Sequence, residues 1–271
     1  MAVKRRGRWP LALLCAVTAT RAAAQSEERD FCADRPGLGT PTCTLDPGRV
    51  QVELGLGDWT RDSSATERRT EFIAGDLLVR IGVGPATEAQ IGWTAYGRTR
   101  LRDSLTGTVS RDDGTGDVLL AIRHNLLSPD GSGTTVAVQP FVTLPTGGNA
   151  IGAGDWGAGV LVPFGFELSD RASLAFTASA EAAVDEDGGG RHLAVGGVAG
   201  ISVDLSDALN ATLEIAATHD DDPAGASTPI LSGVSFGWQP GENWQIDGGA
   251  NLGFNRSAAD LQLYFGISRR F

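Results

Sequence analysis

The chain has 271 residues, 41% of them hydrophobic, and a formal net charge of −11. This hydrophobic content is too high for an intrinsically disordered chain. The acidic balance argues against a nucleic-acid-binding protein, because such proteins need a basic face. The mean hydropathy of −0.06 lies near zero, but an average of this kind hides any alternation of apolar and polar positions.

Residues 1–24 have the features of a secretory signal peptide. A basic start that includes Lys4 and Arg8 precedes the apolar core 11–17, and the small residues 22–24 provide a cleavage site. The apolar core is too short to span a membrane as a helix. This stretch holds five of the 22 basic residues and none of the 33 acidic ones, so the remaining chain has a formal charge of −16.

Apolar and polar residues alternate from residue 50 to the end of the chain. Ala89, Ile91 and Trp93, for example, alternate with polar or small residues. Alternation with a period of two indicates strands that have one apolar and one polar face. The pattern predicts twelve strands, near residues 50–59, 70–83, 87–98, 117–126, 135–144, 156–167, 173–184, 192–205, 209–218, 229–239, 244–253 and 260–271.

Two folds are compatible with such strands, a soluble β-sandwich and a transmembrane β-barrel. The predicted links alternate between short ones, such as 206–208, and long ones, such as 99–116 and 145–155. This order is typical of outer-membrane barrels, whereas a sandwich has no reason to keep it. Aromatic residues such as Trp59 and Trp244 gather near the strand ends, as they do at the two surfaces of a membrane.

The last predicted strand also favours the barrel. Phe265, Ile267 and Phe271 share one alternating face, and the chain ends in an aromatic residue. This resembles the assembly signal of outer-membrane barrels, which predicts the barrel assembly machinery as a partner. No apolar run after residue 24 approaches the 18 residues of a membrane-spanning helix. We therefore predict an all-β protein, an antiparallel up-and-down β-barrel of about twelve strands that contacts lipid in the bacterial outer membrane.

The inward positions of this barrel are mostly polar. Arginines on three consecutive strands would face acidic residues on the other walls. They could orient polar solutes in an open pore or pair with the acids in a closed lumen, and both interpretations stay open. The predicted lumen-lining residues are Arg80, Arg98, Arg123, Glu53, Asp76, Glu88, Asp117, Glu181, Glu214, Asp247 and Tyr264. Four apolar residues fall on the same face, namely Phe72, Leu119, Phe141 and Leu161.

A barrel hydrolase is an alternative from another functional class. The three histidines are His124, His192 and His219, and no strand places a serine beside a histidine on one face. We therefore predict no catalytic residues. Acidic runs such as 220–222 could bind divalent cations, but they are also typical of solvated loops, and we predict neither a metal site nor a cofactor.

Two cysteines, Cys32 and Cys43, lie before the predicted barrel with ten residues between them. In an exported protein such a pair predicts a disulfide, with two free thiols as the alternative. We expect residues 25–49 to form a periplasmic segment before the barrel domain, 50–271. A disulfide would clamp this segment in or under the periplasmic mouth of the barrel.

Three short stretches resemble a known family. Residues 34–37 read Asp-Arg-Pro-Gly, residues 47–55 open the first strand with Pro-Gly and then carry Glu and Gly, and residues 144–147 read Leu-Pro-Thr-Gly. They resemble motifs of the meta-pathway phenol-degradation family of outer-membrane proteins, over about residues 33–271. The resemblance implies a porin-like channel or transporter for small, hydrophobic or aromatic molecules rather than an enzyme. A structural or adhesive barrel with a sealed lumen is the alternative.

Overall fold

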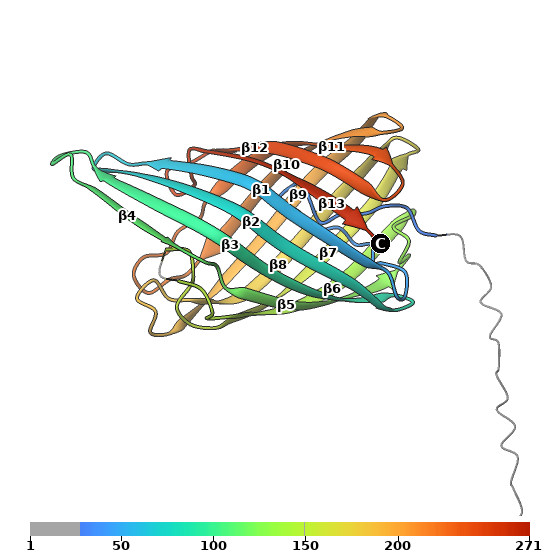
Figure 1. The fold of residues 1–271 in the computed structure, drawn as a ribbon, viewed down its shortest axis with the longest axis horizontal. Helices are drawn as coiled ribbons and strands as arrows, with labels where there is room; N and C mark the ends of the chain where they lie inside the picture. Colours follow the sequence, from blue (N-terminus) through green and yellow to red (C-terminus); the bar gives the residue numbers. More distant parts are fainter. Residues whose placement is uncertain (1–27, 149) are drawn as a thin grey trace, which may run out of the picture.

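The computed structural model describes residues 28–148 and 150–271 (Figure 1). The predicted signal peptide lies outside these residues. Within them no helix is long and apolar enough to cross a membrane. The strands are β1 (Val50–Ser63), β2 (Glu67–Gly84), β3 (Thr87–Asp103), β4 (Val109–Gly114), β5 (Val118–Leu127), β6 (Thr134–Leu144), β7 (Gly157–Ser169), β8 (Ala172–Val184), β9 (Arg191–Ser206), β10 (Leu209–Asp220), β11 (Ile230–Gly241), β12 (Trp244–Gly253) and β13 (Leu261–Arg270).

Twelve of these strands close into an antiparallel barrel. Neighbours in the sequence pair with each other, β3 pairs with β5, and β1 pairs with both β2 and β13. Closure leaves the sheet without a free edge, so the backbone donors and acceptors of the barrel strands find partners within the sheet. The prediction of an up-and-down barrel of about twelve strands is confirmed.

The outer surface of the barrel is apolar and its interior is polar. Ile91 and Leu213 are among the exposed large hydrophobic residues, whereas Arg80, Glu53 and Glu88 are completely buried. A soluble sandwich would bury its apolar face instead. The alternation therefore places apolar side chains toward lipid, as in a transmembrane barrel.

The two ends of the barrel differ in their connections (Figure 1). Two-residue turns join β2 to β3, β7 to β8, β9 to β10 and β11 to β12 at the end where the C-terminus lies. Longer links, such as 145–156 and 221–229, lie at the opposite end. We refer to these as the short-turn end and the long-loop end.

β4 is a strand that the alternation does not predict. It pairs with the outer part of β3, inside the expected long link 99–116. β1 and β2 also run further than expected, so the expected link 60–69 contains only a three-residue turn, 64–66. The projecting sheet of β1–β4, beyond the apolar part of the wall, carries charged residues on both faces, such as Arg100 and Asp103. Strands of this kind lack the hydrophobic alternation on which the prediction depends.

Candidate functional site

The described residues 28–46, which precede β1, enter the barrel at the short-turn end (Figure 1). This segment, 28–46, has no regular secondary structure and contacts the inner wall along its length. The Thr40 backbone N–H donates to Thr177 Oγ1 on β8 at 3.0 Å, and the Thr42 hydroxyl donates to Thr135 Oγ1 on β6 at 2.6 Å. A disulfide joins Cys32 to Cys43, so the predicted pairing is confirmed. We call residues 28–46 the luminal segment.

Buried charges hold the middle of the luminal segment. Arg80 on β2 forms ion pairs with Glu53 on β1 at 3.1 Å and with Glu88 on β3 at 2.9 Å. Asp34 of the luminal segment joins this cluster through Arg80 at 3.0 Å and Arg123 Nη1 at 2.8 Å. Both arginines are completely buried, so an unpaired charge here would be costly. The luminal segment therefore supplies a carboxylate to a charged site formed by four strands, β1, β2, β3 and β5.

Asp34 is ionised in this position. Burial alone would raise the pKa of its carboxyl group, but the positive charges of Arg123 and Arg80 outweigh burial and hold the pKa below its ordinary value. The attachment of Asp34 is thus an attraction between full charges at neutral pH.

Carboxylates of the barrel wall also accept hydrogen bonds from the backbone of the luminal segment. Glu53 accepts from the N–H groups of Asp34 and Arg35, each at 3.0 Å. Glu214 on β10 accepts from Leu38 at 2.8 Å and from Gly39 at 2.9 Å. Hydrogen bonds of this type, with a charged acceptor, are stronger than those between neutral groups. Two separate parts of the barrel wall, β1 and β10, therefore hold the same segment.

Glu88 extends this pattern to the end of the luminal segment. It accepts a hydrogen bond from Leu45 N–H at 2.9 Å, in addition to its contact with Arg80. The chain then passes so close to β2 that a Cβ atom at Gly82 would overlap the carbonyl of Asp46. Only glycine leaves room for this crossing.

A small cavity lies between the luminal segment and the wall formed by β1, β12 and β13. Its volume is about 140 Å³, and it is lined by residues that include Arg35, Leu38, Asn251 and Tyr264. Arg35 forms an ion pair with Asp247 on β12 at 3.2 Å and lies over the Tyr264 ring at 5.9 Å. The Arg35 Nε, the Asn251 Oδ1 and the Tyr264 hydroxyl have no hydrogen-bond partner there. The cavity thus combines an aromatic ring with polar side chains.

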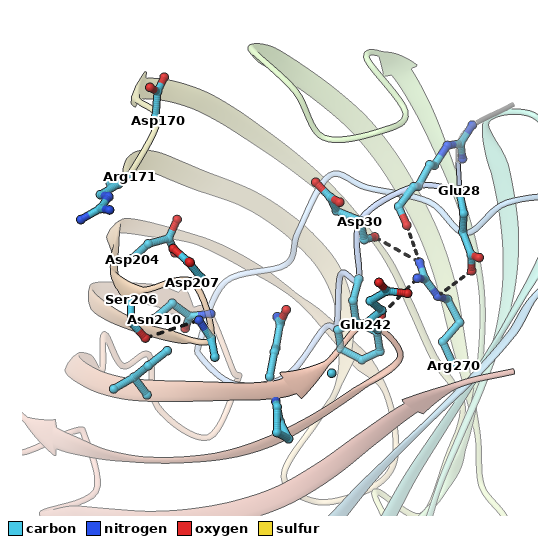
Figure 2. Close-up of a pocket in the computed structure, with 17 residues that line it drawn as sticks. Glu28, Asp30, Asp170, Arg171, Asp204, Ser206, Asp207, Asn210, Glu242 and Arg270 are labelled. Carbon is cyan, nitrogen blue, oxygen red and sulfur yellow. Dashed lines mark hydrogen bonds and ion pairs between the residues drawn. The ribbon is translucent and has the colours of Figure 1, made fainter.

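A larger cavity of about 790 Å³ opens at the short-turn end (Figure 2). Arg270, near the end of β13, lies at its edge and contacts Glu28 at 3.3 Å. Its guanidinium also donates to the carbonyl oxygens of Arg29 at 2.6 Å and Glu242 at 3.2 Å. The start of the luminal segment is therefore fastened to the last strand of the barrel. The acidic residues around this mouth are Glu28, Asp30, Asp170, Asp204, Asp207 and Glu242.

The remaining predicted lining residues lie apart from this cluster. Asp76 accepts a hydrogen bond from Thr94 at 2.9 Å. Asp117 accepts from the backbone of Gly147 and Ala153, both at 2.7 Å, and so holds link 145–156 against the wall. Glu181 lies half-buried on β8. These three acids do not contact the luminal segment.

Arg98 departs from the expected inward position. It is exposed and lies opposite Phe72 on β2 and Asp113 on β4 in the register of the projecting sheet. Gly97 faces the lumen in its place, because a Cβ atom there would overlap Ile151 of link 145–156. The alternation of β3 breaks at Ala95 and Tyr96, neighbours that are both exposed, and the facing Gly75 on β2 has a φ of +71°. Phe72, also expected inside, lies on the outer face with 42% of its surface exposed for the same reason.

The three histidines lie away from the luminal segment's charged cluster. His124 Nδ1 lies 2.8 Å from the Thr87 hydroxyl, and His219 Nδ1 lies 2.9 Å from the Thr228 hydroxyl. His192 at the long-loop end has Asp185 at 2.9 Å from Nδ1 and Asp220 at 2.6 Å from Nε2. Carboxylates at both ring nitrogens suit a protonated imidazole, which donates from both. Together with Asp222, these groups brace the links that follow β8 and β10.

The comparisons with known proteins agree with this geometry. Residues 33–271 match the family described as "Putative MetA-pathway of phenol degradation". The chain belongs to this family. No curated protein sequence matches it significantly.

Two solved structures show the same fold at low sequence identity. The NanC porin is 9% identical with a TM-score of 0.51, and the alignment covers 81% of this chain and 98% of that chain. The β domain of the Bordetella autotransporter BrkA is 13% identical with a TM-score of 0.52, and the alignment covers 83% of this chain and 100% of that chain. The family and the closed barrel with its apolar outer surface identify an outer-membrane β-barrel.

Proposed function

We propose that the protein is an outer-membrane channel for small molecules and that the luminal segment gates it. The observation that carries this proposal is the way in which the segment is held. Asp34, Glu53 and Glu214 fasten it by ion pairs and hydrogen bonds. Such polar contacts can exchange for contacts with water, so the segment can move aside while the barrel stays closed by its strands.

The orientation follows from the connections. Outer-membrane barrels have short turns on the periplasmic side and long loops outside the cell. The short-turn end, the luminal segment and the C-terminus are therefore periplasmic. Solute would enter from the long-loop end and meet the luminal segment before it leaves the barrel.

The cavity beside the luminal segment supports a small hydrophobic or aromatic solute. Its volume of about 140 Å³ is close to that of engineered protein cavities that bind benzene. Tyr264 and Leu38 offer apolar contacts, and Asn251 and Gln262 add polar side chains to the lining. An aromatic molecule with one hydroxyl group fits this combination, in agreement with the family to which the chain belongs.

Conductance of the purified protein in a planar bilayer tests the gate. We expect low conductance from the native protein and a higher open probability from Asp34→Asn, which weakens the link to Arg80 and Arg123. Asp30→Asn is the matched control, because Asp30 lies exposed at the mouth. If neither protein conducts and neither admits phenol into liposomes, the barrel is a sealed structural protein and the channel proposal fails.

We also propose that Phe265, Ile267 and Phe271 form the assembly signal. β13 closes the barrel by pairing with β1, and Phe265 and Phe271 expose 55% and 57% of their surface on its outer face. Phe271→Ala should lower the amount of protein in the outer membrane without changing refolding in detergent. Equal losses in both measurements would indicate a simple effect on stability.

A further inference from the structure

The projecting sheet at the long-loop end carries a basic outer face. Residues two apart on a strand share a face, and so do residues directly opposite each other on paired strands. Arg98, Arg100 and Arg102 follow one another on β3 in this way. Arg98 lies opposite Phe72, which is on the outer face, and Arg102 lies opposite Arg68. The basic face consists of Arg68, Arg98, Arg100, Arg102 and Arg111.

Acidic residues gather on the other face of the same sheet. Glu71 lies opposite Thr99 and lines the lumen with Arg69. The inner positions by the same alternation include Asp62, Glu67, Glu71, Asp103 and Asp112. Asp113 is the acid that shares the outer face, opposite Arg98. The two faces are therefore segregated by charge.

The basic face places like charges directly opposite each other. Arg68 pairs with Arg102 between β2 and β3, and Arg100 pairs with Arg111 between β3 and β4. Like charges in cross-strand positions destabilise a sheet. Among the ion pairs of the described residues, none involves these four arginines. A bound anion would convert this repulsion into attraction.

The basic face also lies at a definite height relative to lipid. Phe72 and its cross-strand neighbour Trp59 are aromatic residues of the outer surface, and such residues mark the membrane interface. Arg98 is level with Phe72, and Arg102 is four residues further, about 13 Å along the strand. The headgroup layer extends about 5–8 Å beyond the hydrocarbon, and a tilted strand crosses it over this length.

We propose that the basic face binds the phosphate groups of a phosphorylated lipid in the outer leaflet of the membrane. Arginine forms paired hydrogen bonds with phosphate oxygens, which makes it well suited to this ligand. The acyl chains of such a lipid would lie along the apolar barrel wall below Phe72. A lipid is favoured over a free anion because the arginines are on the lipid-facing side of the sheet, directly above the aromatic residues.

The test compares two double variants in nanodiscs of phosphatidylcholine, with and without lipid A that carries two phosphates. Arg100→Gln/Arg111→Gln removes one pair of positive charges that face each other between β3 and β4. Arg49→Gln/Arg171→Gln is the control, because it removes the same charge at the short-turn end, from the exposed Arg171 and from Arg49, whose side chain is 43% exposed. Native mass spectrometry measures retained lipid A, and thermal unfolding measures stability in both lipids.

We expect Arg100→Gln/Arg111→Gln to weaken lipid A binding about ten-fold or more, because each arginine contributes charged hydrogen bonds to phosphate. The stability effect should change sign. Without lipid A this variant should unfold at a higher temperature than the native protein, since repulsion is removed, and with lipid A at a lower one. The control should bind lipid A like the native protein.

Two outcomes would overturn the proposal. In the first, both double variants lose lipid A equally, which would indicate an effect of net charge alone. In the second, inorganic phosphate in phosphatidylcholine nanodiscs stabilises the native protein as much as lipid A does, which would indicate an adventitious ion only. If the double variant fails to fold, the single substitution Arg111→Gln replaces it. Its unfolding temperature should likewise be higher than that of the native protein without lipid A and lower with it.

Discussion

The carboxylate of Asp34, inside the barrel, lies 2.8 Å from the buried guanidinium of Arg123 on β5. The same carboxylate lies 3.0 Å from Arg80 on β2. A residue outside the barrel strands thus forms ion pairs with two buried arginines of the wall. Removing Asp34 would leave the buried arginines with fewer ion pairs, and removing either arginine would leave Asp34 with one ion pair instead of two.

We expect Asp34→Ala to weaken the docking of the luminal segment by about 3 kcal/mol. This is the lower end of the range for breaking a buried ion pair, because Arg80 keeps Glu53 and Glu88, and Arg123 keeps Glu88 at 3.4 Å. Hydrogen exchange of the Leu38 and Gly39 amides measures docking directly, since both bind Glu214.

Asp30→Ala is the control for this change. Asp30 belongs to the same segment but is exposed, so its removal should leave the exchange rates unchanged. Unchanged rates in Asp34→Ala as well would mean that the backbone contacts to Glu53 and Glu214 suffice, and the charged cluster would then have no role in docking.

Docking should weaken at acidic pH because of Asp34. The charges of Arg123 and Arg80 lower the pKa of Asp34 below its ordinary value, which is about 3.9. A carboxyl group with a lowered pKa contributes fully above its unfolded pKa, and the contribution is lost as the pH falls through the folded one. After correction for the intrinsic pH dependence of amide exchange, the exchange rates of the luminal segment should be constant from neutral pH to about pH 4. Below that pH they should rise.

Asp34→Asn should remove this acid dependence, because asparagine does not titrate in this range. The comparison of the two proteins at each pH cancels the intrinsic pH dependence of exchange. An acid dependence that survives in Asp34→Asn would assign the effect to another carboxylate of the cluster.

The sequence predicted that Glu53 and Glu214 point into the barrel, but not that they bind the backbone of the luminal segment. Their direction follows from period-two alternation, which is a property of side chains. Their partners in the structure are backbone N–H groups of Asp34 and Leu38. Every residue except proline carries such a group, so no pattern of side chains marks those that will be bound. The position of the luminal segment inside the lumen could be expected only in outline, from the cysteine pair.

Arg98 shows a second limit of the same reasoning. Alternation is counted from residue to residue, so one break reverses every assignment beyond it. On β3 the break lies at Ala95 and Tyr96, which are both exposed, opposite Gly75 with its positive φ. The only mark in the sequence is a glycine on the neighbouring strand, and the chain has 37 glycines. The reversal moves Arg98 from the expected lumen to the outer face, where it joins the basic face.

Loss of the Cys32–Cys43 disulfide should loosen the luminal segment. The bond closes a loop with a sequence separation of 11, and chain-entropy estimates for such a loop give about 3 kcal/mol. Asp34 and Thr42, which contact the wall at β2, β5 and β6, both lie within the loop. Limited proteolysis should therefore cleave the segment faster after reduction. The double variant Cys32→Ser/Cys43→Ser should be cleaved at that faster rate with or without reductant, and protection equal to the native protein would contradict the prediction.

Substitutions on neighbouring residues of β10 test which face meets lipid. Leu213 exposes 59% of its surface and lies opposite Val234 and Ile201, whereas the Thr212 hydroxyl lies 2.7 Å from that of Ser202. An arginine near the middle of the lipid-facing surface costs about 2–4 kcal/mol, so Leu213→Arg should lower the free energy of unfolding by about this amount. Thr212→Arg points into the polar lumen beside Glu214 and should cost less. Urea unfolding from phosphatidylcholine vesicles measures both, and equal losses would mean that the outer surface of β10 does not face lipid.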